Sequence, residues 1–150
     1  MKNIAHIWSV VCSQSVTDEE TKNISLLNLI ERFNIGINKD QKKPDEGTVV
    51  NVGINFELVS RFSKKGEDKD ISFDYQSTLI TPNGKIIGQP NERTIAFRKG
   101  TQNIRIRTKF NEFPLISAGL YHVQVAYRET DSTAYEPAAS IPIEIKIEEK

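Results

Sequence analysis

Three cationic side chains recur at alternate positions of one segment: Arg105, Arg107 and Lys109. Because successive side chains of a β-strand point to opposite faces, all three belong to one outward face, here called the cationic stripe. Such a stripe can bind an anionic partner, either a phosphate backbone or an acidic protein surface. It can also be a solvated strand face balanced by acids on neighbouring strands, for which Glu57 and Asp74 are candidates. The second interpretation is favoured, and nucleic acid is not expected, because no aromatic side chains interleave with the stripe to stack on bases.

The parts for nucleophilic catalysis are Cys12, His6 and His122. This chemistry requires a nucleophile beside a base that a third group orients. Six residues of extended chain separate His6 from Cys12 by about 20 Å, so these two side chains cannot touch within one strand. We therefore expect Cys12 to be a small buried hydrophobic residue. With two histidines and one cysteine at unrelated spacings, no catalytic site, transition metal or cofactor is expected.

Acidic loops raise the alternative of a calcium site, because this cation prefers carboxylate and carbonyl oxygens. The loop candidates are Asp18-Glu19-Glu20, Asp45-Glu46, Glu67-Asp68 with Asp70, and Asp131. Five lysines interleave with them: Lys42, Lys43, Lys64, Lys65 and Lys69. Since these cations would repel calcium and no Asp-x-Asp-x-Asp-Gly pattern is present, solvated loops are favoured.

A carbohydrate site would need exposed aromatic rings. Tyr135, in the loop from Asp131 to Ala139, is the one ring expected at the surface. Trp8, Tyr121 and Tyr127 fall on strand faces assigned to the core.

These residues depend on β-strands for their positions. Alternation of period two predicts five strands, from Val50 to Arg61, Ile71 to Leu79, Ile104 to Phe110, Tyr121 to Tyr127 and Ile141 to Glu148. The run from Ile4 to Cys12 is apolar on both faces and predicts a strand covered on both sides. The segment Ile24 to Ile37 fits a strand interrupted by Glu31, or a short helix through Leu26, Leu27, Ile30 and Phe33. The strand is favoured because β-branched residues surround it.

Turn signals complete the pattern. Thr81-Pro82-Asn83-Gly84-Lys85 predicts a tight hairpin turn into a short strand at Ile86-Ile87. A further short strand is expected at Arg93 to Phe97. Since no amphipathic crossover helix is present, residues 1–150 are predicted to form a single all-β domain. Its architecture is a two-layer antiparallel β-sandwich of immunoglobulin-like type with about eight strands.

The composition fits a globular domain without strong charge. Twenty basic and twenty acidic residues give a formal net charge of zero, so no global field attracts nucleic acid or an anionic membrane. A lone cysteine excludes internal disulfides and favours a reducing compartment. His6 and Ser9 interrupt the apolar run after Lys2, against a secretory leader, and no segment approaches the ~20 apolar residues of a membrane span. A cytoplasmic protein is the expectation.

The opening run ending in Cys12, the acidic turn Asp18-Glu19-Glu20-Thr21 and the Ser25-Leu26-Leu27 strand resemble small uncharacterised bacterial β-sandwich proteins. The Pro82-Asn83-Gly84 turn and the sequence Ala118-Gly119-Leu120-Tyr121 are similar to immunoglobulin-like modules generally. The resemblance implies a fold and no activity.

These observations predict a non-catalytic protein-interaction or assembly module, using the strand Ile4 to Cys12 or an open sheet edge. The partner is an unknown protein or a second copy of the chain. The alternative is a module that binds calcium, carbohydrate or an anionic ligand through loops at one end.

Overall fold

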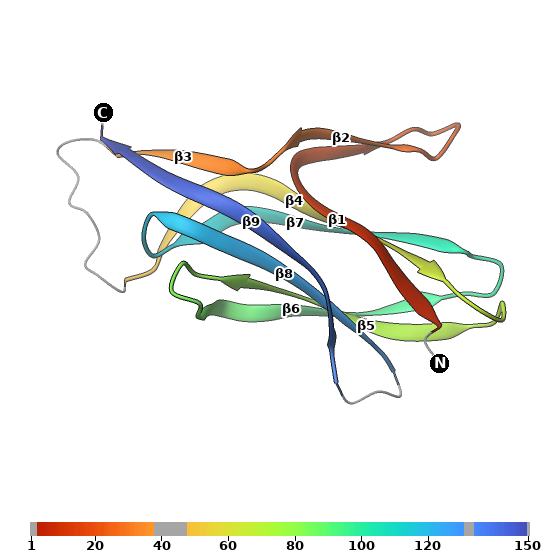
Figure 1. The fold of residues 1–150 in the computed structure, drawn as a ribbon. Helices are drawn as coiled ribbons and strands as arrows, with labels where there is room; N and C mark the ends of the chain where they lie inside the picture. Colours follow the sequence, from red (N-terminus) through yellow and green to blue (C-terminus); the bar gives the residue numbers. More distant parts are fainter. Residues whose placement is uncertain (1–2, 38–47, 131–133, 150) are drawn as a thin grey trace.

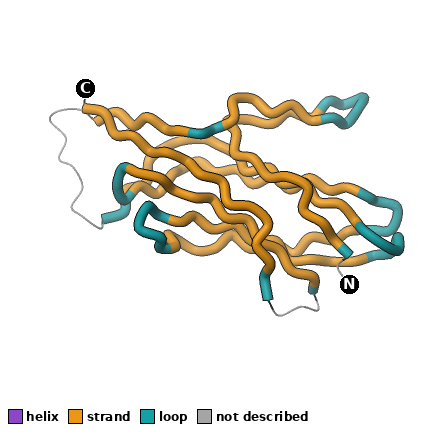
Figure 2. Tube along the Cα trace, viewed as in Figure 1, coloured by secondary structure: helices purple, strands orange, loops and turns teal. Residues whose placement is uncertain are grey.

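The computed structural model describes residues 3–37, 48–130 and 134–149, which form nine strands and their turns (Figures 1 and 2). The strands are β1 (Ile4–Thr17), β2 (Ile24–Leu29), β3 (Arg32–Ile37), β4 (Val50–Lys64), β5 (Ile71–Ile80), β6 (Ile86–Phe97), β7 (Asn103–Leu115), β8 (Gly119–Glu129) and β9 (Glu136–Glu149). These residues contain no helix, and hence none that could span a membrane.

Two sheets pack face to face. The first has the strand order β2-β1-β4-β7, and the second has the order β3-β9-β8-β5-β6. Large aromatic side chains fill the space between the sheets, and Phe62, Phe73, Tyr75, Phe113 and Tyr121 are fully buried there. The predicted two-layer β-sandwich is therefore confirmed.

The alternation of side chains explains why these segments are strands. Along β8, Tyr121, Val123 and Val125 are buried, while Gln124 between them is exposed. Along β7, the inward Ile106 and Thr108 are buried and the outward Arg107 is exposed. All five strands predicted from period-two patterning are present.

The segment Ile24 to Ile37 differs from the predicted strand interrupted by Glu31. It forms two strands, β2 in the first sheet and β3 in the second, and this raises the count to nine. Ile30 is buried at the crossing and its N–H donates to the Val11 carbonyl at 2.8 Å, while the Glu31 carbonyl accepts from Glu144 N at 2.9 Å. The two short strands expected between Ile86 and Phe97 are one strand, β6.

One pair departs from the antiparallel arrangement. β3 runs parallel to β9, with Phe33 beside Ile145 and Ile35 beside Ile147. A crossover helix is not needed to make this pair parallel, because the strands β4 to β8, which belong to both sheets, lie between β3 and β9 in the sequence.

A tyrosine corner marks the fold as immunoglobulin-like. The buried Tyr121 lies near the start of β8, and its hydroxyl accepts hydrogen bonds from Ile116 N at 3.0 Å and Ser117 N at 3.1 Å. The same hydroxyl donates to the Ser117 carbonyl at 2.7 Å. Gly119, two residues earlier, has a φ of 139°, and a Cβ there would lie 2.9 Å from the Pro82 ring. The predicted turn at Pro82 therefore packs directly against this corner.

Removal of the Tyr121 hydroxyl tests the corner. Tyr121→Phe leaves two backbone N–H groups and one carbonyl without their partner, so we expect a loss of about 1–3 kcal/mol in the free energy of unfolding. Urea denaturation measures it, with Tyr135→Phe, at a half-buried position outside the core cluster, as the control. Equal effects of the two variants would contradict the structural role of the corner.

Candidate functional site

The first sheet contains a hairpin that leaves the sandwich. β1 pairs with β4 from Ile4 opposite Lys64 to Cys12 opposite Glu57, and there the ladder ends. Beyond Cys12, β1 pairs with β2 alone, up to Thr17 opposite Ile24. This β1–β2 hairpin (residues 13–29) turns away from the neighbouring strands in Figure 1 and reaches one end of the molecule.

A buried carboxylate holds the base of the hairpin. Glu57 is 5% exposed, and its Oε2 accepts a hydrogen bond from the Ser15 backbone N–H. The carboxylate thus replaces the β4 backbone as the hydrogen-bond partner of β1 where the ladder has ended. Arg107 Nε lies 3.7 Å from Glu57 Oε1, and Arg107 Nη1 donates to Ser15 Oγ at 3.4 Å. Contacts among Ser15, Glu57 and Arg107 therefore link β1, β4 and β7, and this set of contacts is here called the fastening.

The cationic stripe lies on the outward face of β7, as its spacing predicts. Arg105 Nη2 donates to the Lys22 carbonyl at 2.7 Å, near the tip of the hairpin. Lys109 is exposed and lies opposite Glu57 in the β4–β7 ladder. Glu57 supplies the cross-strand acid, whereas Asp74 lies in the second sheet and pairs with Arg128. Both arginines of the stripe therefore contact the hairpin, and binding of an anionic partner by the stripe stays a prediction.

The acidic residues at the hairpin tip shape a turn. Asp18 Oδ1 accepts hydrogen bonds from Glu20 N at 2.9 Å and Thr21 N at 2.8 Å, and these bonds hold the pKa of Asp18 below its ordinary value. Asp18 N donates to the Asn23 carbonyl at 2.9 Å and closes the hairpin. The Asp18 carboxylate is thus committed to backbone groups of its own turn.

A second acidic loop is used in the same way. Asp68 accepts from Gly100 N at 2.9 Å and from Lys64 Nζ at 3.0 Å, and Asp70 accepts from Lys99 N at 2.6 Å. Within the described ranges, no three His, Cys, Asp or Glu side chains gather as metal ligands. The other calcium candidates, Asp45, Glu46 and Asp131, lie outside the described residues.

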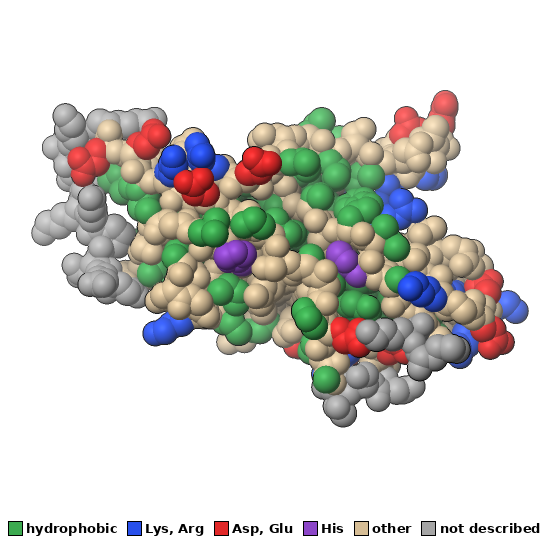
Figure 3. All heavy atoms as spheres, in the orientation of Figure 1, with side chains coloured by type: hydrophobic (Ala, Val, Ile, Leu, Met, Phe, Trp, Pro, Cys, Tyr) green, Lys and Arg blue, Asp and Glu red, His purple; other side chains and the backbone are tan. Residues whose placement is uncertain are grey.

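Exposed hydrophobic side chains gather along the hairpin and the adjoining part of β1. Val16, Leu27 and Leu29 are about half exposed, as is Ile7 where a bulge shifts the β1–β4 register. Figure 3 shows hydrophobic side chains grouped over β1 and β2. Leu27 and Leu29 flank Asn28, whose φ of 55° interrupts the regular alternation of β2.

The outer edge of β2 differs from the other sheet edges. In the described part of the chain no strand pairs with it, and the sequence Ile24–Leu29 contains neither a charge nor a proline. The edge strands β6 and β7 each contain a proline, Pro90 and Pro114, together with two and four charged residues respectively, and β3 begins with Arg32. Charges and prolines are the usual protection of an edge against pairing with another chain. β2 lacks both.

The nucleophile candidates are not brought together. Cys12 is buried in β1, where burial and then the nearby Glu57 carboxylate raise the pKa of its thiol, so the reactive thiolate is disfavoured. His122 lies on β8, in the other sheet. Sequence reasoning missed the actual partner of His6: its Nε2 contacts Ser9 Oγ at 2.8 Å.

That contact begins a chain of hydroxyls that crosses the sandwich. Ser9 Oγ contacts Ser60 Oγ at 2.7 Å, and Ser60 Oγ contacts the buried Tyr75 hydroxyl, on the second sheet, at 3.0 Å. The inward positions of Ser60 and Tyr75 follow from alternation, but their pairing depends on how the sheets pack. The hydroxyls satisfy one another in the core.

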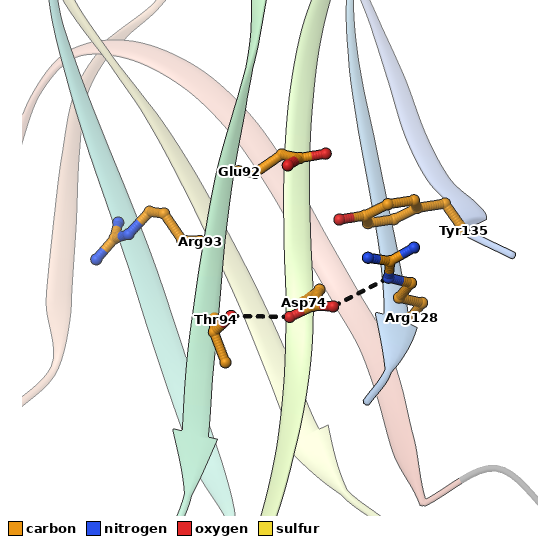
Figure 4. A pocket seen from close by; sticks show the side chains of 6 residues that line it. All are labelled: Asp74, Glu92, Arg93, Thr94, Arg128 and Tyr135. Carbon is orange, nitrogen blue, oxygen red and sulfur yellow. Dashed lines mark hydrogen bonds and ion pairs between the residues drawn. The ribbon is translucent and has the colours of Figure 1, made fainter. Parts of the chain in front are cut away.

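The second sheet carries a polar hollow of about 310 Å³ on its outer face (Figure 4). Asp74 accepts from Thr94 Oγ1 at 2.9 Å and from Arg128 Nε at 2.9 Å, and these donors hold its pKa below the ordinary value. The Arg128 guanidinium lies 4.4 Å from the centre of the Tyr135 ring. Because Asp74 is ionised and accepts two hydrogen bonds, it is unsuited to donate a proton as a general acid.

Tyr127 and Trp8 were both expected on core-facing sides of their strands, and the structure confirms this for Tyr127 alone. Tyr127 packs against the core as expected. Trp8 does not belong to the core cluster, because it lies opposite Arg61 on the outward face of the first sheet and is half-buried.

The comparisons with known proteins concern the fold. No protein-family model matches the chain, and no curated protein matches it. An immunoglobulin-like protein from Pseudomonas aeruginosa is 12% identical over 97% of this chain and 98% of its own, with a TM-score of 0.43. A family 123 glycoside hydrolase from Clostridium perfringens is also 12% identical with a TM-score of 0.43, and the match covers 95% of this chain but 27% of that enzyme. The N-terminal domain of PorA is 10% identical over 94% of this chain and 98% of that domain, with a TM-score of 0.29. The two packed sheets and the tyrosine corner of this chain make its fold an immunoglobulin-like β-sandwich.

Neutralising Glu57 tests the fastening of the hairpin. Glu57→Gln keeps an oxygen acceptor for Ser15 N but removes the charge that pairs with Arg107, so we expect a loss of about 1–3 kcal/mol in stability. Amide hydrogen exchange should accelerate in residues 13–29 more than in β5 and β8. Glu112→Gln, on the exposed face of β7, is the matched control. An unchanged exchange rate in the hairpin would show that Glu57 does not hold it.

Burial lowers the pKa of His6, and this predicts a pH dependence of stability. The unfolded chain takes up a proton at this residue near pH 6.5, whereas the folded chain holds the imidazole neutral to lower pH. Stability should therefore fall as the pH decreases from about 7.5 to about 5, and His6→Gln should flatten this part of the profile. Unfolding free energies measured across this range test it. Parallel profiles for the two proteins would contradict the prediction.

Proposed function

We propose that the protein is a non-catalytic interaction module, and that it binds an extended protein segment along the outer edge of β2. The single observation that carries the proposal is this edge, which is apolar, uncharged, free of proline and unpaired among the described residues. In strand addition, the partner backbone pairs with such an edge while its side chains meet the adjoining surface.

Strand addition requires free backbone groups along an edge and an adjoining surface for the partner's side chains, and the hairpin supplies both. Alternate residues of β2 direct N–H and C=O groups away from β1, toward the place of an added strand. Leu27, opposite Gln14, and Leu29, opposite Cys12, are exposed along β2, and Val16 is exposed on β1. A partner strand beside residues 24–27 would place an apolar side chain against the exposed Leu27.

The fastening at Glu57 supports the same proposal. Ordering a flexible hairpin on binding would cost conformational entropy, and a hairpin already held by Glu57 and Arg107 avoids much of that cost. The turn closed by Asp18 fixes the other end. Residues 24–27, which pair in continuous register with β1, are thus held extended before a partner arrives.

A charge placed on the edge tests the proposal. Leu27→Lys should weaken partner capture, because a lysine on an edge strand opposes pairing and removes apolar contact. Leu120→Lys is the matched control, since Leu120 on β8 and Leu27 are both 47% exposed. Tagged wild-type protein and both variants are used to capture partners from source-cell lysate, and self-association is measured by sedimentation. The captured protein is then purified and titrated against all three.

The expected result is affinity reduced at least about tenfold by Leu27→Lys and unchanged by Leu120→Lys. Partner binding or self-association that resists Leu27→Lys would contradict strand addition at β2. Equal losses in both variants would point to general surface hydrophobicity instead.

A further inference from the structure

We propose that the outer face of the second sheet binds an uncharged oligosaccharide, laid across β5, β8 and β9 beside Tyr135. This site is separate from the β2 edge, which belongs to the other sheet. Two adjoining hollows mark it, one of about 310 Å³ and one of about 570 Å³, and Tyr135 lines both.

The location on a sheet face limits the kind of ligand. β5 pairs with β6 and β8, and β8 pairs with β5 and β9, so the backbone groups of these strands are used within the sheet. A peptide strand therefore finds no backbone to pair with on this face. The ligand must be recognised by side chains.

Those side chains carry neutral hydrogen-bonding groups in a row. Thr78, Gln124 and Ser140 lie side by side on β5, β8 and β9, and Gln76 follows on the same face of β5. Each hydroxyl or amide can both donate and accept, which matches the hydroxyl groups of a sugar. The row crosses three strands, a span of about 10 Å between the outer two, so it is long enough for more than one sugar ring.

Apolar surface lies beside the polar row. Ala126, Pro137 and Ala138 line the larger hollow together with the Tyr135 ring. A sugar ring has C–H groups on its faces and hydroxyls around its rim, so it needs both kinds of surface, and an aromatic ring supplies a flat apolar one.

Tyr135 is held in position at this place. Arg128 lies against its ring at 4.4 Å, and Asp74 in turn holds Arg128 at 2.9 Å. Figure 4 shows Tyr135, which immediately precedes β9, reaching across Arg128 toward Glu92. A ring fixed in this way loses little freedom when a ligand stacks beside it.

The charges around the hollow favour a neutral ligand. The hollow is lined by two acids and two arginines, and the Arg128 charge is paired with Asp74. Arg93 donates to the Arg107 carbonyl at 3.3 Å and points away from the other labelled side chains in Figure 4. The Glu92 carboxylate, which accepts from Gln76 Nε2 at 3.2 Å, would repel an anion. Sulfated or uronic-acid sugars are therefore poorly matched to this face.

Backbone-resolved NMR titration tests the proposal. ¹⁵N-labelled protein is titrated separately with cellohexaose, xylohexaose and maltohexaose at millimolar concentration, and with a heparin hexasaccharide. We expect at least one neutral sugar to shift amides of β5, β8 and β9 around Gln76, Gln124 and Ser140. Tyr135→Ala should weaken binding about tenfold, and Tyr135→Phe, which keeps the ring, should retain most of it.

Leu27→Lys should leave sugar binding unchanged, so failure of the β2 proposal and failure of this one are distinguishable. Amide shifts outside the site report whether each variant remains folded. Three results would overturn the proposal: no shifts with any of the neutral sugars, shifts confined to other surfaces, or binding of the heparin hexasaccharide alone.

Discussion

The Glu57 carboxylate accepts the Ser15 N–H at the point where β1 leaves β4, and the presentation of the β1–β2 hairpin depends on this contact. An acid that is 5% exposed would be costly without partners, and Ser15 and Arg107 supply them. The same residues satisfy the backbone of β1 where its ladder has ended. β1 can therefore leave β4 with the Ser15 N–H satisfied, and it carries the unprotected edge of β2 with it.

The two sheets divide the surface into regions of different chemistry. The first sheet offers backbone groups and apolar side chains at β2, which suit a protein strand. The second offers side chains on a face whose backbone is already paired, which suits a hydroxyl-rich ligand. The tyrosine corner and the aromatic core hold the two sheets against each other. The β2 edge and the outer face of the second sheet therefore do not depend on each other for their shape.

Much of the fold could be predicted from the sequence, because the five strands with clean alternation each bury one face. The division of Ile24 to Ile37 between two sheets could not be predicted. Its pattern is continuous, and only the hydrogen bonds of Ile30 and Glu31 with distant strands reveal the crossing. The stripe on β7 and its acid Glu57 were identifiable from spacing, but the role of both arginines in holding the hairpin depends on register. The cluster around Tyr135 joins three strands, and the sequence contains no local signal for it.

The most direct test of the central claim is amide hydrogen exchange of the protein alone and in complex with its purified partner. Binding by strand addition predicts that the outward amides of β2 become protected, with little change along β6 and β7, whose edges contain proline and charge. Protection centred on another edge or on a sheet face, with the amides of Ile24–Leu29 unchanged, would contradict the account.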